Sequence, residues 1–389
     1  MKLLFTGDVC FNYQPELEET MAQTALADML PLFRQADYRV MNLETPLCPE
    51  HIGAPIEKSG PNLVGRPRNI AFLTTAGCDC AILANNHTGD YGDDALYATL
   101  DLLDSRGIAH TGAGANLDEA YRPWRIAKDG VSVSVIAVCE NEFGIATAEK
   151  PGAAGFSWEW LGDRIRMERM VSRYVIVVFH GGAEHYPLPT PLTRERYRTI
   201  IRLGADAVIG GHPHTMQGYE LYDGKPIYYS MGNFFFQYVP RQDASWYRGY
   251  MVMLNLTASG VSGEVIPYTA DPDTMRLTPV TGQGYKNTIV YLEKLSAYIG
   301  NTTELKRLYE GWCTISGFGY SRSLMLDPAY MTVTDTPAPI APLKNLFGCE
   351  AHNELMRTTL DLAFFGDLAK AAEAREEIRR LQEMPEIDR

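Results

Sequence analysis

Histidine, carboxylate and amide side chains stand directly after several short apolar stretches of this 389-residue chain. Five of the eight histidines fall in three such places, one of which reads Gly-Gly-His212-Pro-His214. Imidazole nitrogens and carboxylate or amide oxygens suit Mn, Fe or Zn, whereas closed structural zinc sites usually contain thiolates. These residue types therefore predict a metal site. The candidate residues are Asp8, Glu44, Asn86, His87, His180, His212 and His214.

Each candidate taken alone has a simpler interpretation. Asp8 follows an apolar stretch, where aspartate most often caps a helix or stabilises a turn, and a single histidine is more often a core residue. The combination is more specific, because His212 and His214 are spaced to face one cavity from an extended backbone. Asp90 stands three residues after His87 and is placed to orient its ring. Together these segments favour a metal site.

The elements that would position these side chains alternate between apolar runs and amphipathic stretches, which is typical of an α/β domain. We expect helices over residues 93–105 and 194–203, each followed by a glycine. Ligands of open α/β sheets bind at the carboxyl ends of strands, where residues distant in sequence meet. The expected strands are Lys2–Thr6, Tyr38–Asn42, Cys80–Ala84, Val131–Val138, Tyr174–Phe179, Ala207–Ile209 and Ile227–Ser230.

The pattern changes beyond residue 239. Alternating residues over 250–256 and 263–269 predict antiparallel strands, and residues 284–310 and 343–386 look helical, with a last helix over Asp367–Met384. The stretch between these helical regions, Gly317–Pro342, contains many Gly, Ser, Thr and Pro residues and predicts a long loop or partial linker. We therefore expect one domain over residues 1–280 and a mostly helical C-terminal extension over residues 281–389.

The composition narrows the possible partners and compartment. A net charge of −13 and the lack of a long basic run argue against nucleic acid. The sequence has no apolar run of about 18 residues and begins in an apolar strand rather than a signal peptide, so no membrane span is expected. Seven scattered cysteines, an odd number, are typical of reduced thiols. These features predict a cytoplasmic protein.

Six segments, taken in order, resemble the poly-γ-glutamate capsule-biosynthesis CapA-like family, a branch of the calcineurin-like metallophosphatase superfamily. They cover roughly residues 1–240, and the segments are Gly7-Asp8-Val9, Asn42-Leu43-Glu44, Asn85-Asn86-His87-Thr88-x-Asp90-Tyr91-Gly92, His180-x-Gly182-x-Glu184-x-Tyr186, Gly204-Ala205-Asp206-x-Val208-Ile209-Gly210-x-His212-Pro213-His214 and Tyr229-Ser230-x-Gly232-Asn233-Phe234. The resemblance implies a four-layer α/β/β/α sandwich with two divalent metal ions at the strand ends. The helical extension lies outside these motifs.

The resemblance also assigns metal ligands. Asp8 and His214 would hold one ion, and Glu44 would stand where the superfamily has a bridging aspartate. The other ion would be held by Asn86, His180 and His212. The superfamily has a histidine two residues after the first aspartate, where this chain has Cys10, so Cys10 is a further candidate ligand.

His87 has a different role by this resemblance. It would not bind metal but would donate a hydrogen bond to the charge that develops in the transition state. Asn86, His87 and Asp90 form the expected catalytic set, and a metal-activated hydroxide would be the nucleophile. From the residues themselves, Ser230 and Asn233 are candidates for hydrogen-bond donors that support the metal ligands, and an ordinary strand followed by a turn is the equal alternative.

Three functions remain open from the sequence. The first is a metal-dependent hydrolase that acts on phosphoesters of phosphorylated or anionic small molecules. The second is a non-catalytic component of polyglutamate assembly or export, and the third is a hydrolase of γ-glutamyl amide bonds. An acidic polymer would need basic residues near the site, for which Arg66, Arg68, Arg241 and Arg248 are candidates unless they are simply solvated.

Overall fold

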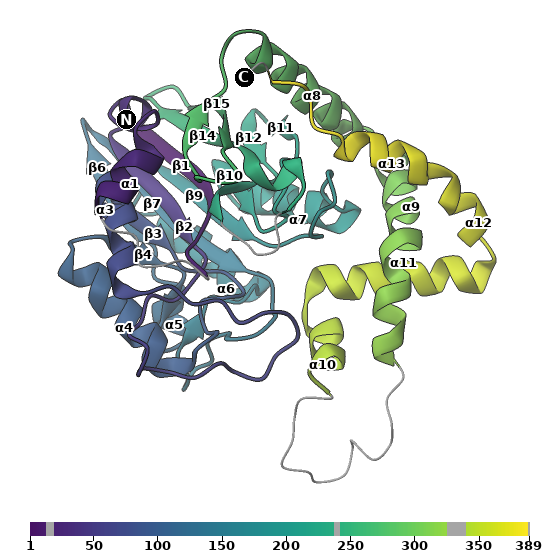
Figure 1. Ribbon diagram of the computed structural model, residues 1–389, viewed down its shortest axis with the longest axis horizontal. Coiled ribbons are helices and arrows are strands. Elements are labelled where there is room, and N and C mark those ends of the chain that lie inside the picture. Colours follow the sequence, from purple (N-terminus) through teal and green to yellow (C-terminus); the bar gives the residue numbers. More distant parts are fainter. Residues whose placement is uncertain (13–18, 237–241, 325–339, 388–389) are drawn as a thin grey trace.

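The computed structural model describes residues 1–12, 19–236, 242–324 and 340–387. Two β-sheets and their covering helices make up one side of the molecule, and the C-terminal helices lie along the other (Figure 1). Arg241 lies outside the described residues, as does most of the predicted loop Gly317–Pro342.

The first sheet is mixed and has the order β16-β15-β14-β1-β2-β3-β4, with β13 also paired to β1. Strands β1 to β4 and β13 run parallel, whereas β14, β15 and β16 are antiparallel. The strands are β1 (Lys2–Cys10), β2 (Tyr38–Leu43), β3 (Cys80–Ile82), β4 (Ala109–Thr111), β13 (Asn233–Phe236), β14 (Arg248–Leu256), β15 (Val261–Ala270) and β16 (Leu277–Pro279).

The second sheet has the order β11-β12-β10-β9-β7-β6, with four parallel strands between two antiparallel edges. Its strands are β6 (Trp124–Lys128), β7 (Val131–Cys139), β9 (Tyr174–His180), β10 (Ala207–Gly211), β11 (Tyr219–Tyr222) and β12 (Lys225–Tyr228), and β5 (Ala113–Gly114) pairs separately with β8 (Gly152–Ala153). The seven strands predicted before residue 239 are therefore present, the two predicted over 250–256 and 263–269 correspond to β14 and β15, and β1 extends four residues further than predicted.

Alternating side chains along β1 explain the layers. Leu3 and Phe5 enter the cluster shared with the second sheet, whereas Leu4 enters the cluster shared with α1, α3 and α4. Helices α6 and α7 cover the outer face of the second sheet. The predicted four-layer α/β/β/α sandwich is thus confirmed. The helices of this part are α1 (Glu19–Leu26), α2 (Leu30–Phe33), α3 (Ile70–Ala76), α4 (Gly92–Ser105), α5 (Leu117–Ala120), α6 (Trp158–Glu168) and α7 (Pro191–Arg202).

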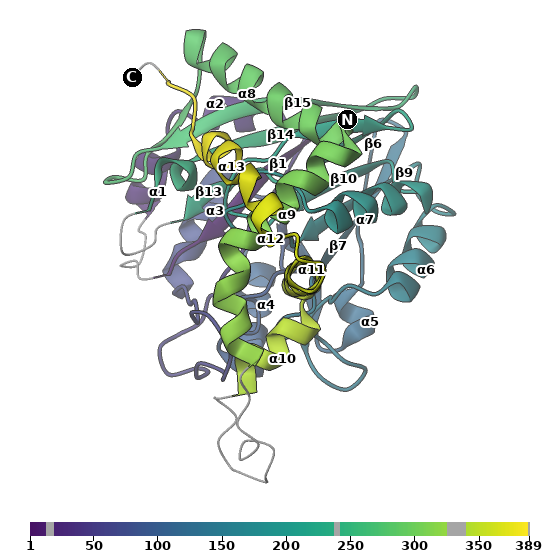
Figure 2. The ribbon, with the colours of Figure 1, turned by 90° about the vertical axis from the view of Figure 1, so that its right-hand side faces the viewer.

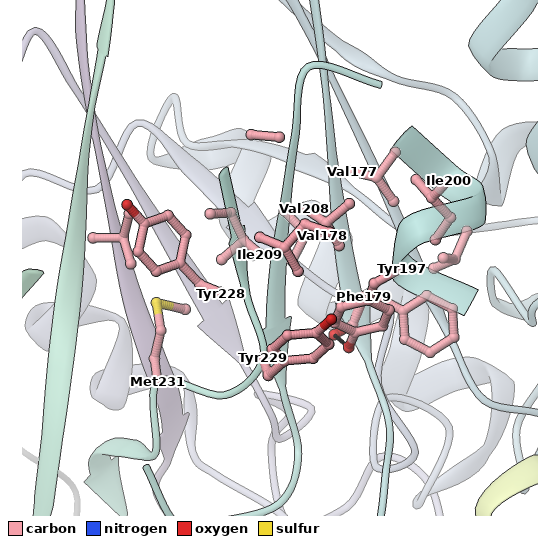
Figure 3. Close-up of a cluster of buried hydrophobic side chains, with 14 of the residues drawn as sticks. Val177, Val178, Phe179, Tyr197, Ile200, Val208, Ile209, Tyr228, Tyr229 and Met231 are labelled. Carbon is pink, nitrogen blue, oxygen red and sulfur yellow. Dashed lines mark hydrogen bonds between the residues drawn. The ribbon is translucent and has the colours of Figure 1, made fainter. Parts of the chain in front are cut away.

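Aromatic packing fixes α7 on the second sheet (Figure 3). The ring of Tyr197 in α7 lies 5.3 Å, centroid to centroid, from Phe179 of β9 and from Tyr229, with which it is stacked. Ile200, one helical turn further, packs near Val177 in the same cluster. This contact holds the end of β9, and with it His180, in a fixed position.

The C-terminal helices share the core of the sandwich. Leu292 and Leu295 of α8 and Leu308 of α9 belong to the same apolar cluster as both sheets. The helices are α8 (Gly282–Gly300), α9 (Thr302–Ser321), α10 (Ala341–Gly348), α11 (Glu350–Phe365), α12 (Leu368–Ala371) and α13 (Arg375–Gln382), and α9 and α11 cross closely (Figure 2). The division into domains at residue 280 stays a prediction. Within the described residues, no helix is long and apolar enough to cross a membrane.

Two predictions about this region are wrong. Residues 317–321 are helical rather than part of a loop, because Gly317 lies against Thr359 of α11, where a Cβ atom would come within 2.3 Å of its side chain. Close helix packing here outweighs the low helix propensity of glycine. The helix predicted over Asp367–Met384 is interrupted by a 3₁₀ turn, Ala372–Ala374, which separates α12 from α13.

Two glycines let the ends of the sheets come together. A Cβ atom on Gly7 would lie 1.8 Å from the carbonyl oxygen of Gly232, and one on Gly210 would lie 2.0 Å from that of Tyr229. Neither neighbour is a flexible side chain that could move aside. The backbone itself therefore requires glycine at these positions.

Substituting Gly7→Ala should lower the free energy of unfolding by about 1–3 kcal/mol or more, because the methyl group forces the backbone of β1 away from Gly232. Gly300→Ala is the matched control, since an added Cβ at the end of α8 meets nothing within 4 Å. Urea unfolding of both variants measures the difference. Equal midpoints for the two variants would contradict the required close approach.

Candidate metal centre

The sequence candidates meet at the carboxyl ends of strands from both sheets. Asp8 lies in β1, His180 ends β9, and the other residues follow β2, β3 or β10. All are buried, although they are separated by up to about 200 residues of sequence. The structure brings together Asp8, Glu44, Asn86, His87, His180, His212 and His214.

Asp8 is held by two donors. Nδ2 of Asn42 lies 2.7 Å from its Oδ1, and the backbone N–H of His212 lies 3.2 Å from its Oδ2. Burial, together with the charge of Glu44, raises the pKa of Asp8 to about 7. Residues of both sheets thus hold the carboxylate of Asp8 in place, while burial and the neighbouring Glu44 disfavour its ionised form.

Glu44 is completely buried and neither of its carboxylate oxygens has a hydrogen-bond partner among the described residues. Oε1 lies 3.5 Å from Nε2 of His180 and 4.0 Å from Nε2 of His214. Burial and the nearby carboxylates, first Glu184, raise its pKa well above the usual value. An unpartnered carboxylate between imidazoles is the arrangement that a bound cation would satisfy.

Two groups of donors share Glu44. Glu44 with His180 and His212 forms one, and Glu44 with Asp8 and His214 forms the other. Within each group the ligand atoms lie within 4.8 Å of one another, close enough to surround a single ion. Each group supplies both imidazole nitrogen and carboxylate oxygen, so the residues present fit divalent metal ions.

The three imidazoles contact one another and their supports. Nε2 of His180 lies 3.1 Å from Oδ1 of Asn86 and 3.2 Å from Nδ1 of His212, and Nδ1 of His214 lies 2.9 Å from Oδ1 of Asn233. Burial lowers the pKa of His212 and of His214 to about 3, and that of His180 below its usual value. The rings are therefore neutral at pH 7, the form that binds metal.

The backbone of the His-x-His segment is strained. His212 and His214 have φ angles of 97° and 56°, and His185 has 59°. Residues other than glycine seldom adopt such angles, and they do so mainly where the surrounding structure imposes them at a functional site. The extended backbone expected for His212 to His214 is therefore wrong, although both rings still enter the same cluster.

His87 lies at the wall of the adjoining cavity. Its Nδ1 is 2.6 Å from Oδ2 of Asp90, as the spacing of the two residues predicts, and 3.2 Å from Nζ of Lys58. Lys58 is also paired with Asp90 in a salt bridge that is almost entirely buried. Sequence reasoning missed Lys58, because a single lysine in a Pro- and Gly-rich loop gives no local signal.

Cys10 is not brought into either donor group. The register of β1 shifts between Asp8 and Val9 against β13 and between Phe5 and Asp8 against β2, so the simple alternation that would place Cys10 beside Asp8 is broken. Cys10 instead packs among apolar side chains against the helix layer, and burial raises the pKa of its thiol well above the usual value. The geometry offers no reason to count it as a ligand.

The remaining candidates are the proposed supporting residues Ser230 and Asn233 and the arginines proposed to lie near the site. Asn233 supports His214 as described, whereas Ser230 accepts from Gly232 and donates to the carbonyl of Thr215. None of the described arginine candidates lines the cavity. Arg66 donates a hydrogen bond to the carbonyl oxygen of Cys48 and forms a salt bridge with Glu50. Arg248 donates a hydrogen bond to the carbonyl oxygen of Pro385.

A buried ion pair that the sequence did not reveal supports the loop after His180. Oε1 of Glu140 lies 2.7 Å from Nη1 of Arg196, and its Oε2 accepts from the backbone N–H of Gly182 at 3.2 Å. Burial alone would raise the pKa of Glu140, but the guanidinium of Arg196 reverses this and lowers it. Glu140 and Arg196 are 56 residues apart in sequence, so no local sequence pattern predicts that they pair.

The layer order and the histidine, carboxylate and amide donors at the ends of the parallel strands agree with the four-layer sandwich that the sequence resemblance implies. The chain belongs to the family described as bacterial capsule synthesis protein PGA_cap, whose model matches residues 2–238. The family resemblance seen in the sequence is thus confirmed.

Several curated relatives share this part of the chain. The PGA biosynthesis protein CapA of Bacillus subtilis is 27% identical over 249 residues, which are 63% of this chain and 64% of that protein. The capsule biosynthesis protein CapA of Bacillus anthracis is 27% identical over 271 residues, 67% of this chain and 64% of that protein. The chain thus spans less than two thirds of the length of these relatives.

Two solved structures are similar at lower identity. A hypothetical protein from Thermus thermophilus is 17% identical and covers 69% of this chain and 99% of its own, with a TM-score of 0.41. A 5'-nucleotidase precursor from the same organism is 15% identical and covers 68% of this chain and 54% of its own, also with a TM-score of 0.41.

Substituting Arg196→Met should destabilise the protein by about 3–5 kcal/mol, because Glu140 would be left buried without its cation. Adding Glu140→Gln should recover much of this loss, since no charge then remains unpaired. Arg379→Met is the control, because its salt bridge with Glu376 is exposed and should contribute little. Thermal unfolding measures all three, and a double variant no more stable than Arg196→Met would refute the account.

Proposed function

We propose that this chain is a hydrolase of phosphoesters that depends on two divalent metal ions. The observation that supports it most is Glu44, which belongs to both groups of donor atoms and whose two buried oxygens have no hydrogen-bond partner in the described part of the chain. A shared carboxylate flanked by two donor groups is what a pair of neighbouring cations needs. Neutral imidazoles and carboxylates suit Mn, Fe or Zn better than Ca or Mg.

In this proposal, Asp8 and His214 hold one ion, and His180, His212 and Asn86 hold the other. Bound divalent ions supply Lewis acidity for the phosphoryl oxygens and lower the pKa of water. Neighbouring residues of the chain hold the proposed ligands in place. Asn42 fixes the carboxylate of Asp8, and Asn233 fixes the ring of His214.

His87 is assigned the role of a hydrogen-bond donor to the substrate rather than a ligand. Its Nδ1 faces Asp90 and Lys58, which fix the ring. We place the donated hydrogen bond at the opposite nitrogen, Nε2, because the ring lines the cavity beside the metal groups. A donor held in this way stabilises negative charge on a transferring phosphoryl group without reorganisation.

The names of the relatives suggest a process in which this chemistry is used. They refer to capsule or PGA biosynthesis, and a relative in Mycobacterium tuberculosis, 27% identical over 220 residues, is called a probable polyglutamine synthesis accessory protein. A non-catalytic part in polyglutamate assembly is therefore the second candidate. Hydrolysis of γ-glutamyl amide bonds at the same metal site is a third.

Removing a proposed ligand should remove metal. Full-length protein with His180→Ala or His212→Ala, purified with added Mn²⁺, should hold at most about half the metal of the unchanged protein, because each change deletes one donor of the first group. Elemental analysis measures the metal content. His51→Ala, at an exposed histidine, is the control and should hold the full amount. Full occupancy in both ligand variants would refute the proposed site.

The variant Glu44→Gln separates metal binding from folding. Without metal, the variant should be at least as stable as the unchanged protein, because an unpartnered buried carboxyl is replaced by a neutral amide. With Mn²⁺, the unchanged protein should gain about 3 kcal/mol or more at saturating metal, and the variant should gain little. Thermal unfolding with Mn²⁺ and with EDTA checks this, and an equal Mn²⁺ gain in both proteins would contradict it.

The three functions differ in which substrate is cleaved. Metal-loaded protein is assayed with p-nitrophenyl phosphate and with a γ-glutamyl peptide, and His87→Ala is compared in each case. We expect phosphoester cleavage that falls by about 10²–10³-fold in His87→Ala while its metal content is unchanged. Cleavage of the peptide alone would favour the amide hydrolase, and cleavage of neither would favour the non-catalytic role.

A further inference from the structure

A cavity of about 500 Å³ lies above the candidate metal centre. The sandwich contributes Asn86, His87 and His214 to its wall, so the cavity opens directly onto the donor groups. Its volume is in the range of pockets that bind small molecules. It is therefore the place where the proposed hydrolase would hold the rest of its substrate.

The C-terminal helices build the other side of this cavity. The lining residues from the helical part of the chain are Ser316, Gly319 and Tyr320 of α9, Pro342 and Asn345 of α10, and His352 of α11. The family model ends at residue 238, so this wall lies outside the matched region. The helices are thus part of the site rather than a separate module beside it.

Hydrogen bonds hold the wall against the loops that follow β7 and β9. Glu350 of α11 accepts from the backbone N–H and the Nδ2 of Asn141 at 2.9 and 2.6 Å. Glu354, one turn later, accepts from the hydroxyl of Thr190 at 2.5 Å and from the N–H of Leu192 at 3.0 Å. The first contact is to the loop after β7 and the second is to the N-terminus of α7, which follows the loop after β9, so the position of α11 is fixed relative to both segments.

Aromatic stacking and an amide complete the attachment. Trp312 of α9 stacks on Tyr186, six residues after His180, with ring centroids 5.1 Å apart. Nδ2 of Asn345 donates to Oε2 of Glu142 at 3.2 Å. Because α9, α10 and α11 each have such a contact, the wall is preformed.

The charges of the cavity are distributed unevenly. The lining residues from the helices include no Asp, Glu, Lys or Arg, and the described residues from the sandwich add two carboxylates, Glu142 and Glu184. The basic lining residue Lys58 is engaged by Asp90 and His87. Away from the metal groups, the described wall therefore offers carboxylates and neutral polar groups to a substrate, and repels further negative charge.

We propose that helices α9, α10 and α11 form the substrate-selecting wall of this site, and that it admits small phosphoesters whose remaining part is uncharged or cationic while it excludes polyanionic chains. This inference rests on the proposed function for the position of the phosphoryl group. Polyglutamate is accordingly a poor occupant of the cavity, whichever process the protein serves.

Two phosphomonoesters of similar size test the selection. Phosphoethanolamine ends in an ammonium group and phosphoglycolate in a carboxylate, and both are titrated calorimetrically into the full-length protein loaded with Mn²⁺. We expect about tenfold tighter binding of phosphoethanolamine, because its ammonium group would lie in the part of the cavity lined by Glu142 and Glu184. A short γ-linked glutamate oligomer should bind more weakly than either.

Placing a cation in the wall should reverse the preference. His352→Lys and Ser316→Lys, on two different helices, should each bring the affinity for phosphoglycolate to that of phosphoethanolamine or above it, with circular dichroism to confirm folding. Phe364→Lys is the charge-matched control, since Phe364 is in α11, does not line the cavity and is 84% exposed. It should keep the original preference.

The outcomes separate this inference from the proposed function. If the preference is found but p-nitrophenyl phosphate is not hydrolysed, the selecting wall is supported and the hydrolase is refuted. If the two esters bind equally or not at all, if the oligomer binds as tightly as phosphoethanolamine, or if Phe364→Lys changes the preference as much as His352→Lys, the selecting wall is refuted even where hydrolysis is observed.

Discussion

The carboxylate of Glu44 is buried at the point where strands of both sheets end, without a hydrogen bond from any residue that the structure describes. Taking such a group from water costs several kcal/mol unless a cation or a proton compensates it. The residues around it are arranged for a cation, because neutral imidazoles from the second sheet and a second carboxylate from the first face the same space. The arrangement of both sheets can be understood as the means of holding these donors around one unsatisfied carboxylate.

That requirement explains the unusual backbone nearby. Side chains from two sheets converge on Glu44 only if the strand ends approach more closely than ordinary packing allows, which glycine at positions 7 and 210 makes possible. The left-handed conformations of His212 and His214 belong to the same geometry, at a cost of about 1–3 kcal/mol each. The aromatic and aliphatic core around β9 and β10 supplies the stability that tolerates this strain.

The strand-end donors could be predicted from sequence because two regularities act together. Apolar runs identify parallel strands, and the carboxyl ends of such strands meet at one edge. Neither regularity applies to Lys58, which comes from a loop, or to Glu140 and Arg196, whose pairing depends on the tertiary fold. No sequence pattern indicates the register shift after Asp8 either. A regular strand without this shift would place Cys10 beside the metal groups, as the two-residue spacing predicts.

The contacts of the C-terminal helices with the rest of the chain were even harder to predict from the sequence. Glu350 and Glu354 are spaced by one helical turn, which in sequence is typical of a solvated helix face. In the folded chain they instead accept hydrogen bonds from backbone N–H groups, Glu350 from the loop after β7 and Glu354 from the first turn of α7, and burial raises the pKa of Glu354 to about 7. Glu142 lies in the loop after β7 and Glu184 in the loop after β9, the two segments that these helices contact. The helices and the carboxylates of the cavity are therefore positioned together. A family motif confined to the first 240 residues therefore describes where the metals would bind, whereas the proposed selecting wall consists of residues beyond it.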